Sequence, residues 1–315
     1  MDNYIFELNA NVSRTTVHYH NRFGIRLAGD VYLPKQRPQT KLPALIIGAP
    51  YGGVKEQSPG LYANELAQRG FAVLTFDPSF NGYSDGTPRH ISSPEVFTED
   101  FSAGVDYMGT REYVDRNQIG VLGICGSGGF ALSAAQVDRR IKAIATVSMY
   151  DISRVQRYGL YDSQTTEQRN AFLDLLGEQR YAEFEGASEA VLTPRGAAIG
   201  FDDTTDPISR EFGEFYSTPR GYHHNALSQF TMTSSLSFNN FDLLNHLEAI
   251  SPRPVLLIVG ENAHSKYFSD DVYAKLQEPK EELVIPGAGH VDLYDNKNLI
   301  PFARLTDFFK EHLVK

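Results

Sequence analysis

The chain has 315 residues, of which 41% are hydrophobic and 22% are charged. This composition is typical of a globular protein, and the length suits one α/β core with an insertion. The formal net charge of −10 argues against a surface that binds nucleic acid or an anionic membrane. No stretch approaches the roughly 20 apolar residues that a membrane-spanning helix needs.

A single cysteine excludes an internal disulfide framework and a thiolate metal cluster. A lone thiol suits a reducing compartment. The first ten residues, with two acidic side chains, lack the basic and apolar regions of a secretory signal. We therefore expect a cytoplasmic protein.

Short β-rich runs alternate with amphipathic helical runs, which predicts a mostly parallel sheet with helices on both faces. Strands are expected at residues 15–20, 25–33, 42–49, 71–76, 119–124, 141–148, 254–260 and 282–285. Helices are expected at residues 59–69, 95–108, 127–136, 164–184 and 299–313. The first two strands flank a turn at residues 21–24, and we expect them to pair antiparallel.

The pattern changes after Asp151. Residues 152–240 are polar and aromatic and contain no clear buried strand. We therefore predict a core formed by residues 1–151 and 241–315, with residues 152–240 inserted as a largely helical cap. A cap of this kind would cover the carboxyl ends of the strands, where ligands bind in open α/β sheets.

A cysteine stands between a predicted strand and a predicted helix. A sharp strand–turn–helix elbow requires small residues two positions before and two positions after its nucleophile. Gly123 and Ser127 stand at those positions around Cys125. We predict Cys125 as the nucleophile, with its sulfur near the helix N-terminus, which would lower the thiol pKa. A rival register, flanked by Cys125 and Gly129, makes Ser127 the nucleophile, and a third interpretation is a buried cysteine without catalytic role.

The general base of such a site is a histidine that follows the last strand. His290 meets this condition, because it ends the glycine-rich turn at residues 286–290 after the strand at 282–285. His264 is the weaker alternative.

The acid that would orient the histidine is less well defined. Its usual position lies three residues after Gly260, where this chain has Ala263. Asp151, just past a predicted strand, and Glu261 are the two candidates, and Asp151 is slightly favoured. A cysteine depends less on this carboxylate than a serine does, because histidine alone can generate the thiolate. Asp270, Asp271 and Asp292 are less favoured alternatives.

An oxyanion hole needs one backbone N–H just after the nucleophile and another from the loop after the first buried strand. Gly126 supplies the first. In the loop at residues 48–53, Pro50 has no N–H, so Tyr51 is the expected second donor.

Several polar residues are candidates for substrate binding. Lys55, Glu56 and Gln57 follow the oxyanion loop and are expected either at the mouth of the pocket or as a helix cap. Tyr222 of the predicted cap is a further candidate. His223 and His224 beside it have no partner spacing that indicates a metal site, and we expect neither metal nor cofactor.

The motifs at residues 52–57, 123–129, 266–269 and 289–294 together resemble a branch of the α/β-hydrolase superfamily. This branch is related to dienelactone hydrolases and includes fungal polyketide transferases, and the resemblance covers nearly the whole chain. It implies acyl chemistry through a cysteine: hydrolysis of an ester or thioester, or transfer of the acyl group to an alcohol. The absence of aspartate at position 263 and the long insertion depart from dienelactone hydrolase itself.

The opening strands carry a second resemblance. Residues 23–34 are similar to the start of the X-prolyl peptidase and cocaine-esterase group. Members of that group use an elbow serine and add a jelly-roll domain, for which no residues remain in this chain.

The sequence thus predicts an α/β-hydrolase-fold esterase, thioesterase or acyltransferase that forms an acyl-cysteine intermediate with a small to medium, partly apolar substrate. Two alternatives stay open: a catalytically weak or inactive binding protein, and a serine hydrolase that uses Ser127. The expected partner is the small-molecule acyl substrate. A homodimer is the assembly that stays open, whereas nucleic acid and membranes are not expected partners.

Overall fold

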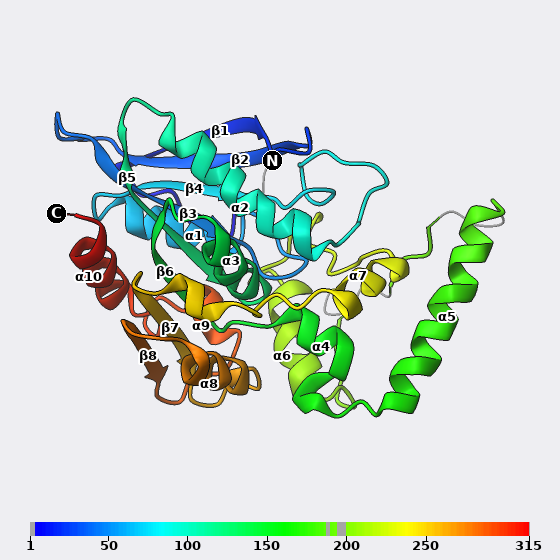
Figure 1. The fold of residues 1–315 in the computed structure, drawn as a ribbon. Helices are drawn as coiled ribbons and strands as arrows, with labels where there is room; N and C mark the ends of the chain where they lie inside the picture. Colours follow the sequence, from blue (N-terminus) through cyan, green and yellow to red (C-terminus); the bar gives the residue numbers. More distant parts are fainter. Residues whose placement is uncertain (1–3, 187–189, 194–199, 315) are drawn as a thin grey trace.

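A computed structural model describes residues 4–186, 190–193 and 200–314. One eight-stranded sheet runs through the molecule in the order β1-β2-β4-β3-β5-β6-β7-β8 (Figure 1). Strands β3 to β8 are parallel, β2 is antiparallel to β4, and β1 is antiparallel to β2. The strands are β1 (Val12–His20), β2 (Arg26–Pro34), β3 (Leu42–Gly48), β4 (Ala72–Phe76), β5 (Val114–Ile124), β6 (Ile141–Val147), β7 (Val255–Gly260) and β8 (Lys280–Ile285). The predicted strands and the antiparallel start are confirmed.

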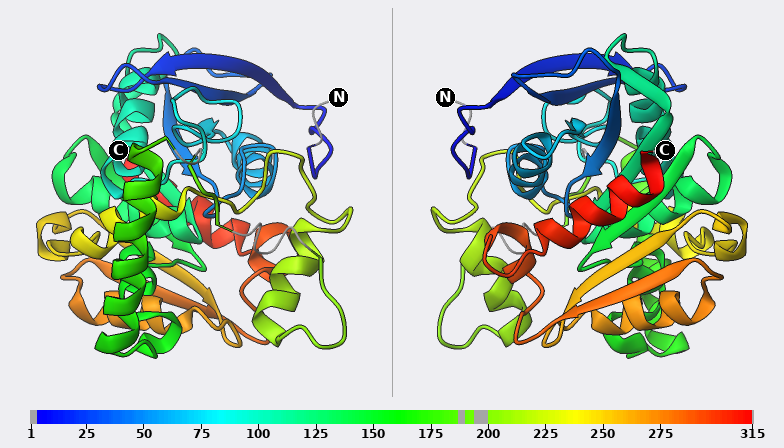
Figure 2. Two further views of the ribbon diagram at one scale, coloured as in Figure 1. Left: turned by 90° about the vertical axis from the view of Figure 1, so that its right-hand side faces the viewer. Right: turned by 90° about the vertical axis from the view of Figure 1, so that its left-hand side faces the viewer.

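Helices cover both faces of the sheet (Figures 1 and 2). α1 (Ser58–Ala67) and α10 (Phe302–Leu313) pack on one face, and the other carries α2 (Pro94–Gly109), α3 (Gly126–Val137) and α8 (Lys266–Lys275). The predicted fold class is confirmed, although the sequence did not predict α8 or the short α9 (Asp292–Asp295). Within the described ranges, no helix is both long and apolar enough to cross a membrane.

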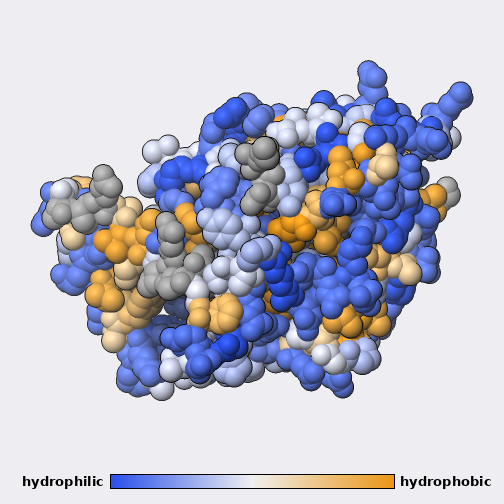
Figure 3. Space-filling model, turned by 180° about the vertical axis from the view of Figure 1, so that it is seen from behind, coloured by the Kyte–Doolittle hydropathy of each residue, from blue (hydrophilic) through white to orange (hydrophobic). Residues whose placement is uncertain are grey.

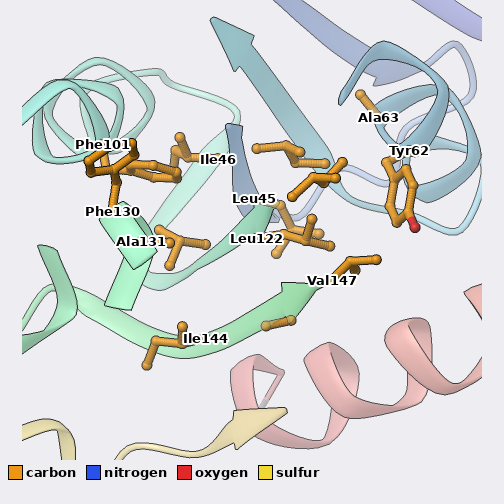
Figure 4. Close-up of a cluster of buried hydrophobic side chains, with 14 of the residues drawn as sticks. Leu45, Ile46, Tyr62, Ala63, Phe101, Leu122, Phe130, Ala131, Ile144 and Val147 are labelled. Carbon is orange, nitrogen blue, oxygen red and sulfur yellow. The ribbon is translucent and has the colours of Figure 1, made fainter. Parts of the chain in front are cut away.

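The central strands are buried on both faces, which explains their nearly continuous apolar sequence. Figure 4 shows Ile46 of β3 close to Phe101 of α2 and Phe130 of α3, with Tyr62 of α1 on the other side of the sheet. These side chains are all at most 2% exposed, and burying one such chain contributes about 1.5–3 kcal/mol. The well-packed strands therefore provide a firm base for the loops at their carboxyl ends.

Residues 152–240, hereafter the insertion, separate β6 from β7 in the chain. The insertion contacts the loop that follows β3. A Cβ at Gly52, whose φ is +84°, would lie 2.5 Å from the Cα of Ser228, and Gln57 Nε2 donates to the carbonyl of Gly221 at 2.5 Å. The described elements of the insertion are α4 (Ile152–Tyr158), the 3₁₀ turn η1 (Leu160–Asp162), α5 (Thr166–Phe184), α6 (Pro207–Tyr216), η3 (Met232–Ser234) and α7 (Ser235–Asn240). A further 3₁₀ turn, η4 (Leu247–Ile250), precedes β7.

Helix α5 stands apart from the sheet (Figure 1). A capping box at Thr165 begins it, and Leu176 is its one buried residue. Leu175 and Phe184 are 54% and 94% exposed, and Figure 3 shows hydrophobic side chains at this edge of the molecule. The helix therefore buries little of its surface, and among the described elements it contacts η3 of the insertion.

Candidate active site

Cys125 occupies a strained turn between β5 and α3. Its backbone has φ 54° and ψ −122°, a conformation that residues other than glycine rarely adopt. The N–H of Cys125 donates to the carbonyl of Val147 at 2.9 Å, and its carbonyl accepts from Gly128 at 2.9 Å. A Cβ at Gly123 would lie 2.1 Å from the carbonyl oxygen of Ser127. The turn therefore has the geometry that the small-residue pattern predicted, with Cys125 at its apex.

Ser127 lies two residues further along, as the second residue of α3. Its Oγ donates to the carbonyl of Ala49 at 2.5 Å. This hydroxyl therefore ties α3 to the loop after β3, and the strained position belongs to Cys125.

Two backbone N–H groups favour the ionised form of the Cys125 thiol and so act to lower its pKa. They belong to Tyr51, in the loop after β3, and to Gly126, the first residue of α3, the two donors predicted for the oxyanion hole. The thiol is 6% exposed, and burial raises its pKa, although the N–H groups and the side chain of Tyr294 oppose the rise. The predicted lowering of the thiol pKa is therefore wrong, because lost hydration outweighs these stabilising interactions.

His290 lies in the turn after β8 and is fully buried. Its Nδ1 is 2.6 Å from Ser265 Oγ, and its Nε2 is 3.0 Å from the Tyr294 hydroxyl. Ser148 Oγ donates to the carbonyl of His290 at 3.0 Å. Burial, and secondarily the neighbouring His264, hold the pKa of His290 well below its usual value, so the imidazole is neutral near pH 7.

Neither predicted carboxylate contacts the imidazole of His290 among the described residues. Asp151 caps α4 by accepting from the N–H of Arg154 at 3.0 Å. Glu261 accepts from the N–H of Gly287 at 2.8 Å. The expectation that one of them orients His290 is therefore not met, because each carboxylate stabilises a local turn and a serine hydroxyl occupies the position beside Nδ1.

Ser265 is a site residue that was not predicted from the sequence, because α8 was not predicted either. Ser265 is the residue before this helix, and a serine immediately before a helix is a common N-cap signal. Tyr294 stands four residues after His290 within a segment that already carried the family resemblance. Residues four apart lie on one side of a helical turn, which is the signal that could have identified it.

The insertion packs directly on the histidine turn. Glu211 of α6 accepts from the N–H of Val291 at 2.7 Å, and its other carboxylate oxygen lies 3.5 Å from His264 Nδ1. The ring of His264 packs against that of His290 in a tilted arrangement, with centroids 4.7 Å apart, and Nε2 of His264 is 2.5 Å from the Tyr150 hydroxyl. α6 thus covers His290 and the turn that carries it.

The three polar residues after the oxyanion loop are buried, which corrects their expected place at the pocket mouth. Lys55 Nζ forms ion pairs with Glu56 and with Asp77, which follows β4. Burial opposes the charge on Lys55, yet the carboxylates of Asp77 and Glu56 raise its pKa. One cation shared by two buried carboxylates leaves excess negative charge, and burial together with Asp77 raises the pKa of Glu56 to about 7.

Gln57 completes this correction. Its Oε1 accepts from the N–H of Val54 at 3.0 Å, while its Nε2 reaches the carbonyl of Gly221 in the insertion. It precedes α1 but forms no side-chain cap. Tyr222, the fourth predicted substrate-binding residue, is 51% exposed. Lys55, Glu56 and Gln57 therefore support the loop after β3, which carries Tyr51. The part of the chain that the structure describes holds no group of three or more His, Cys, Asp or Glu residues suited to a metal ion.

The chain was compared with known protein families, and one family matches it. The family described as "X-Pro dipeptidyl-peptidase (S15 family)" matches residues 24–188, just over half of the 315 residues. The chain belongs to the S15 family. This agrees with the resemblance of the opening strands, and it makes the protein an enzyme of the α/β-hydrolase class, as predicted.

Three relatives of this S15-family chain span most of its length. PA2218 of Pseudomonas aeruginosa is 50% identical over 98% of this chain and 83% of its own length, and its crystal structure aligns with a TM-score of 0.96. The thiohydrolase aneE of Aspergillus aculeatus is 33% identical over 87% of this chain and 83% of its own. The polyketide transferase grgF of Penicillium sp. is 26% identical over 96% and 98%, and the structure of this α/β hydrolase aligns with a TM-score of 0.80. The predicted α/β-hydrolase fold is confirmed.

The buried ion pairs of Lys55 lead to a stability prediction. Lys55→Met leaves Asp77 and Glu56 buried without their cation, which is expected to cost about 3–5 kcal/mol of unfolding free energy. Urea denaturation measures the loss. The matched control is Lys297→Met, which removes a pair with Glu65 from a lysine that is 57% exposed, and about 1 kcal/mol or less is expected. Equal losses in both variants would contradict the prediction.

The raised pKa of Cys125 predicts its reactivity. Because the thiol is protonated near pH 7, iodoacetamide should alkylate the folded protein slowly, with an apparent pKa above the roughly 8.5 of an unperturbed cysteine. Mass spectrometry across a pH series measures the rate. The same protein unfolded in urea is the control and should return to the ordinary value. Alkylation of the folded protein with a pKa below that of the unfolded chain would show that the N–H groups outweigh burial.

Proposed function

We propose that the protein is an acyl hydrolase or acyltransferase that works through an acyl-enzyme on Cys125. His290 takes the thiol proton, and the thiolate attacks the carbonyl carbon of an ester or thioester. The N–H groups of Tyr51 and Gly126 stabilise the oxyanion. The attack gives a tetrahedral intermediate, and its collapse expels the alcohol or thiol, which receives the proton from His290. The acyl group, now bound to sulfur, then passes to water or to an alcohol.

One observation carries this proposal: Cys125 stands at the apex of the strained turn, with φ 54°, and the backbone N–H groups of Tyr51 and Gly126 both favour its thiolate. An oxyanion that forms on a carbonyl attacked by this sulfur would lie within reach of the same donors. The neutral state of His290 supports its role as the base, since only the unprotonated imidazole can accept a proton. The free thiol of Cys125 suits a reducing compartment, and the cytoplasm is part of the proposal.

The insertion is proposed to act as the cap over this site. Cys125 and His290 are buried in the closed arrangement, so a substrate enters when α6 moves away from the histidine turn. Phe215 and Tyr216 of α6 are buried close to the ring of Tyr294, and such aromatic walls favour a partly apolar acyl group. The names of relatives, a thiohydrolase and a polyketide transferase, are in keeping with acyl substrates.

A binding protein without turnover is the second candidate. Two features favour it: the thiol is protonated near pH 7, and a hydroxyl from Ser265 replaces the carboxylate that usually orients the histidine. A serine hydrolase is less favoured, since the Ser127 hydroxyl is engaged with the carbonyl of Ala49.

The nucleophile is tested with p-nitrophenyl esters and acyl thioesters. Intact mass spectrometry should find one acyl group on Cys125, and Cys125→Ala should lose turnover by roughly 10³-fold or more. Ser127→Ala is the matched control and should retain turnover within about tenfold, because it loses one tethering hydrogen bond of about 1 kcal/mol. The reverse pattern would make Ser127 the nucleophile. If the unmodified protein forms no acyl adduct and shows no turnover, the second candidate, a binding protein without catalytic activity, would be favoured.

Ser265 should matter because it is the partner of His290 Nδ1. Ser265→Ala leaves a buried nitrogen unsatisfied, which costs about 1–3 kcal/mol, and we expect kcat/KM to fall about 10- to 100-fold. Ser269→Ala is the control, since Ser269 is a buried serine of α8 whose hydroxyl has no hydrogen-bond partner among the described residues. Steady-state kinetics of both variants measure the effect. Equal kinetics in both would deny Ser265 a role in orienting the base.

A further inference from the structure

A carboxylate from the insertion reaches the histidine turn, residues 286–291, which carries His290. Glu211 of α6 accepts a hydrogen bond from the backbone N–H of Val291, with Oε1 2.7 Å from the nitrogen. The carboxylate lies so close to the turn that a Cβ at Gly289 would be 2.7 Å from Oε1. Glycine at position 289 therefore leaves the space that the carboxylate of Glu211 occupies.

The same carboxylate faces a second histidine. Oε2 of Glu211 lies 3.5 Å from Nδ1 of His264, and this buried nitrogen has no hydrogen-bond partner among the described residues. On the other side of the ring, Nε2 lies 2.5 Å from the Tyr150 hydroxyl. An ionised carboxylate only accepts hydrogen bonds, so the favourable arrangement of His264 carries a proton on Nδ1, facing Glu211. A carboxylate, an imidazole and a hydroxyl thus follow one another beside the site.

His264 connects Glu211 to the candidate base. The ring of His264 packs against that of His290, and the ring of Phe212, the neighbour of Glu211 in α6, lies 5.4 Å from His264 and 5.2 Å from His290. The ring nitrogens of His290 have Ser265 and Tyr294 as partners, and no ion pair with a carboxylate is present among the described residues. Glu211 can therefore act on His290 only through its neighbours and through its charge.

The carboxylate of Glu211 is ionised near pH 7. Burial raises its pKa, but His264 and the N–H of Val291 lower it more, so that the pKa of Glu211 lies below its usual value. Its side chain is 27% exposed, so water screens the charge only in part. When His290 accepts the thiol proton, a positive charge forms on the far side of the His264 ring. A nearby negative charge favours this protonated state.

We propose that Glu211 is a positioning residue for His290, supplied by the insertion in place of the carboxylate that a core loop usually provides. It fixes the histidine turn through Val291, holds His264 against His290, and offsets the positive charge that His290 gains during acylation. Because α6 carries Glu211, the base is fully assembled only while the insertion is closed over the site. This inference rests on the proposed acyl transfer at Cys125.

Glu211→Gln tests the role of the charge, because the amide oxygen can still accept from Val291 while the negative charge is lost. Acylation is followed as the burst of p-nitrophenol from p-nitrophenyl acetate. The dependence of the burst rate on ester concentration separates the limiting acylation rate from the half-saturating concentration. The limiting rate should fall about 10- to 100-fold, with the half-saturating concentration within about threefold, because the lost interaction favours the transition state and not the bound ester.

Glu214→Gln is the matched control for charge. Glu214 is an exposed residue of the same helix, and its carboxylate forms no hydrogen bond or ion pair among the described residues. The variant removes one negative charge from α6 without changing the histidine turn, so the limiting rate should stay within about twofold. A loss as large as that of Glu211→Gln would make the effect one of net charge and overturn the proposal.

Arg220→Met is the control for closure of the insertion. Arg220 Nη2 donates to the carbonyl of Val291 at 3.3 Å, and its guanidinium pairs with Asp295. This variant loosens the insertion on the histidine turn but keeps the carboxylate of Glu211. It should raise the half-saturating concentration and keep the limiting acylation rate within about threefold, since weaker closure weakens the binding of ester and transition state alike.

Gly289→Ala tests the same contact from the side of the turn. The added methyl group should displace the carboxylate of Glu211, so the limiting rate should fall as in Glu211→Gln, and this variant gives the same readout should Glu211→Gln fail to fold. In a Glu211→Ala background no carboxylate is displaced, and Gly289→Ala should change the rate by less than about threefold. Losses that multiply in the double variant would show that the two positions act independently and would overturn the placement of Glu211 at the turn.

Several results would overturn the inference and leave the proposed function in place. They are an unchanged limiting rate in Glu211→Gln, a change confined to the half-saturating concentration, and equal losses of limiting rate in Glu211→Gln and Arg220→Met. In each case, an acyl group found on Cys125 of the unmodified protein by mass spectrometry upholds the acyl-cysteine mechanism. The absence of that acyl group would overturn the proposed function and this inference with it.

Discussion

The positive φ of Cys125 is the constraint on which the site depends. A residue with a side chain in this conformation costs about 1–3 kcal/mol, and it persists only where its surroundings determine it. Here the surroundings are the hydrogen bond to Val147 and the close passage of α3 over Gly123. Because the turn is sharp, the N–H of Gly126 faces the same sulfur as the N–H of Tyr51. This one backbone angle thus places the candidate nucleophile next to both candidate oxyanion donors.

Burial sets the electrostatics of the arrangement. It raises the pKa of the Cys125 thiol and lowers the pKa of His290, so the resting pair is neutral on both sides. A thiolate–imidazolium pair would place two charges in a site with little water, which costs free energy unless fixed hydrogen bonds stabilise them. The N–H groups, Ser265 and Tyr294 are the fixed dipoles available. These groups can stabilise the charges on Cys125 and His290 when the charges form, and both residues can remain neutral in the resting state.

Local sequence patterns predicted the sheet, five of the ten described α-helices (α1, α2, α3, α5 and α10) and the apex position of Cys125, because these depend on short-range periodicity and on the space that glycine leaves. These patterns did not predict side-chain environments that depend on residues distant in the sequence. Lys55 looks like a surface residue until its ion pair with Asp77, 22 positions away, is formed. The partner of His290 is also a matter of tertiary packing, since Ser265 reaches it only after β7 and α8 are in place.

The isolation of α5 has a consequence for its local stability. The helix has 19 residues and one buried side chain, Leu176, whereas most of the stability of helices in proteins comes from packing an apolar face against the rest of the fold. Its amide hydrogens are therefore expected to exchange with solvent through local opening, at a free-energy cost far below that of global unfolding. The amides of β3 and β5, which lie in the middle of the sheet, are expected to exchange only when the whole core opens. The chain would thus contain a slowly exchanging catalytic core beside a rapidly exchanging arm.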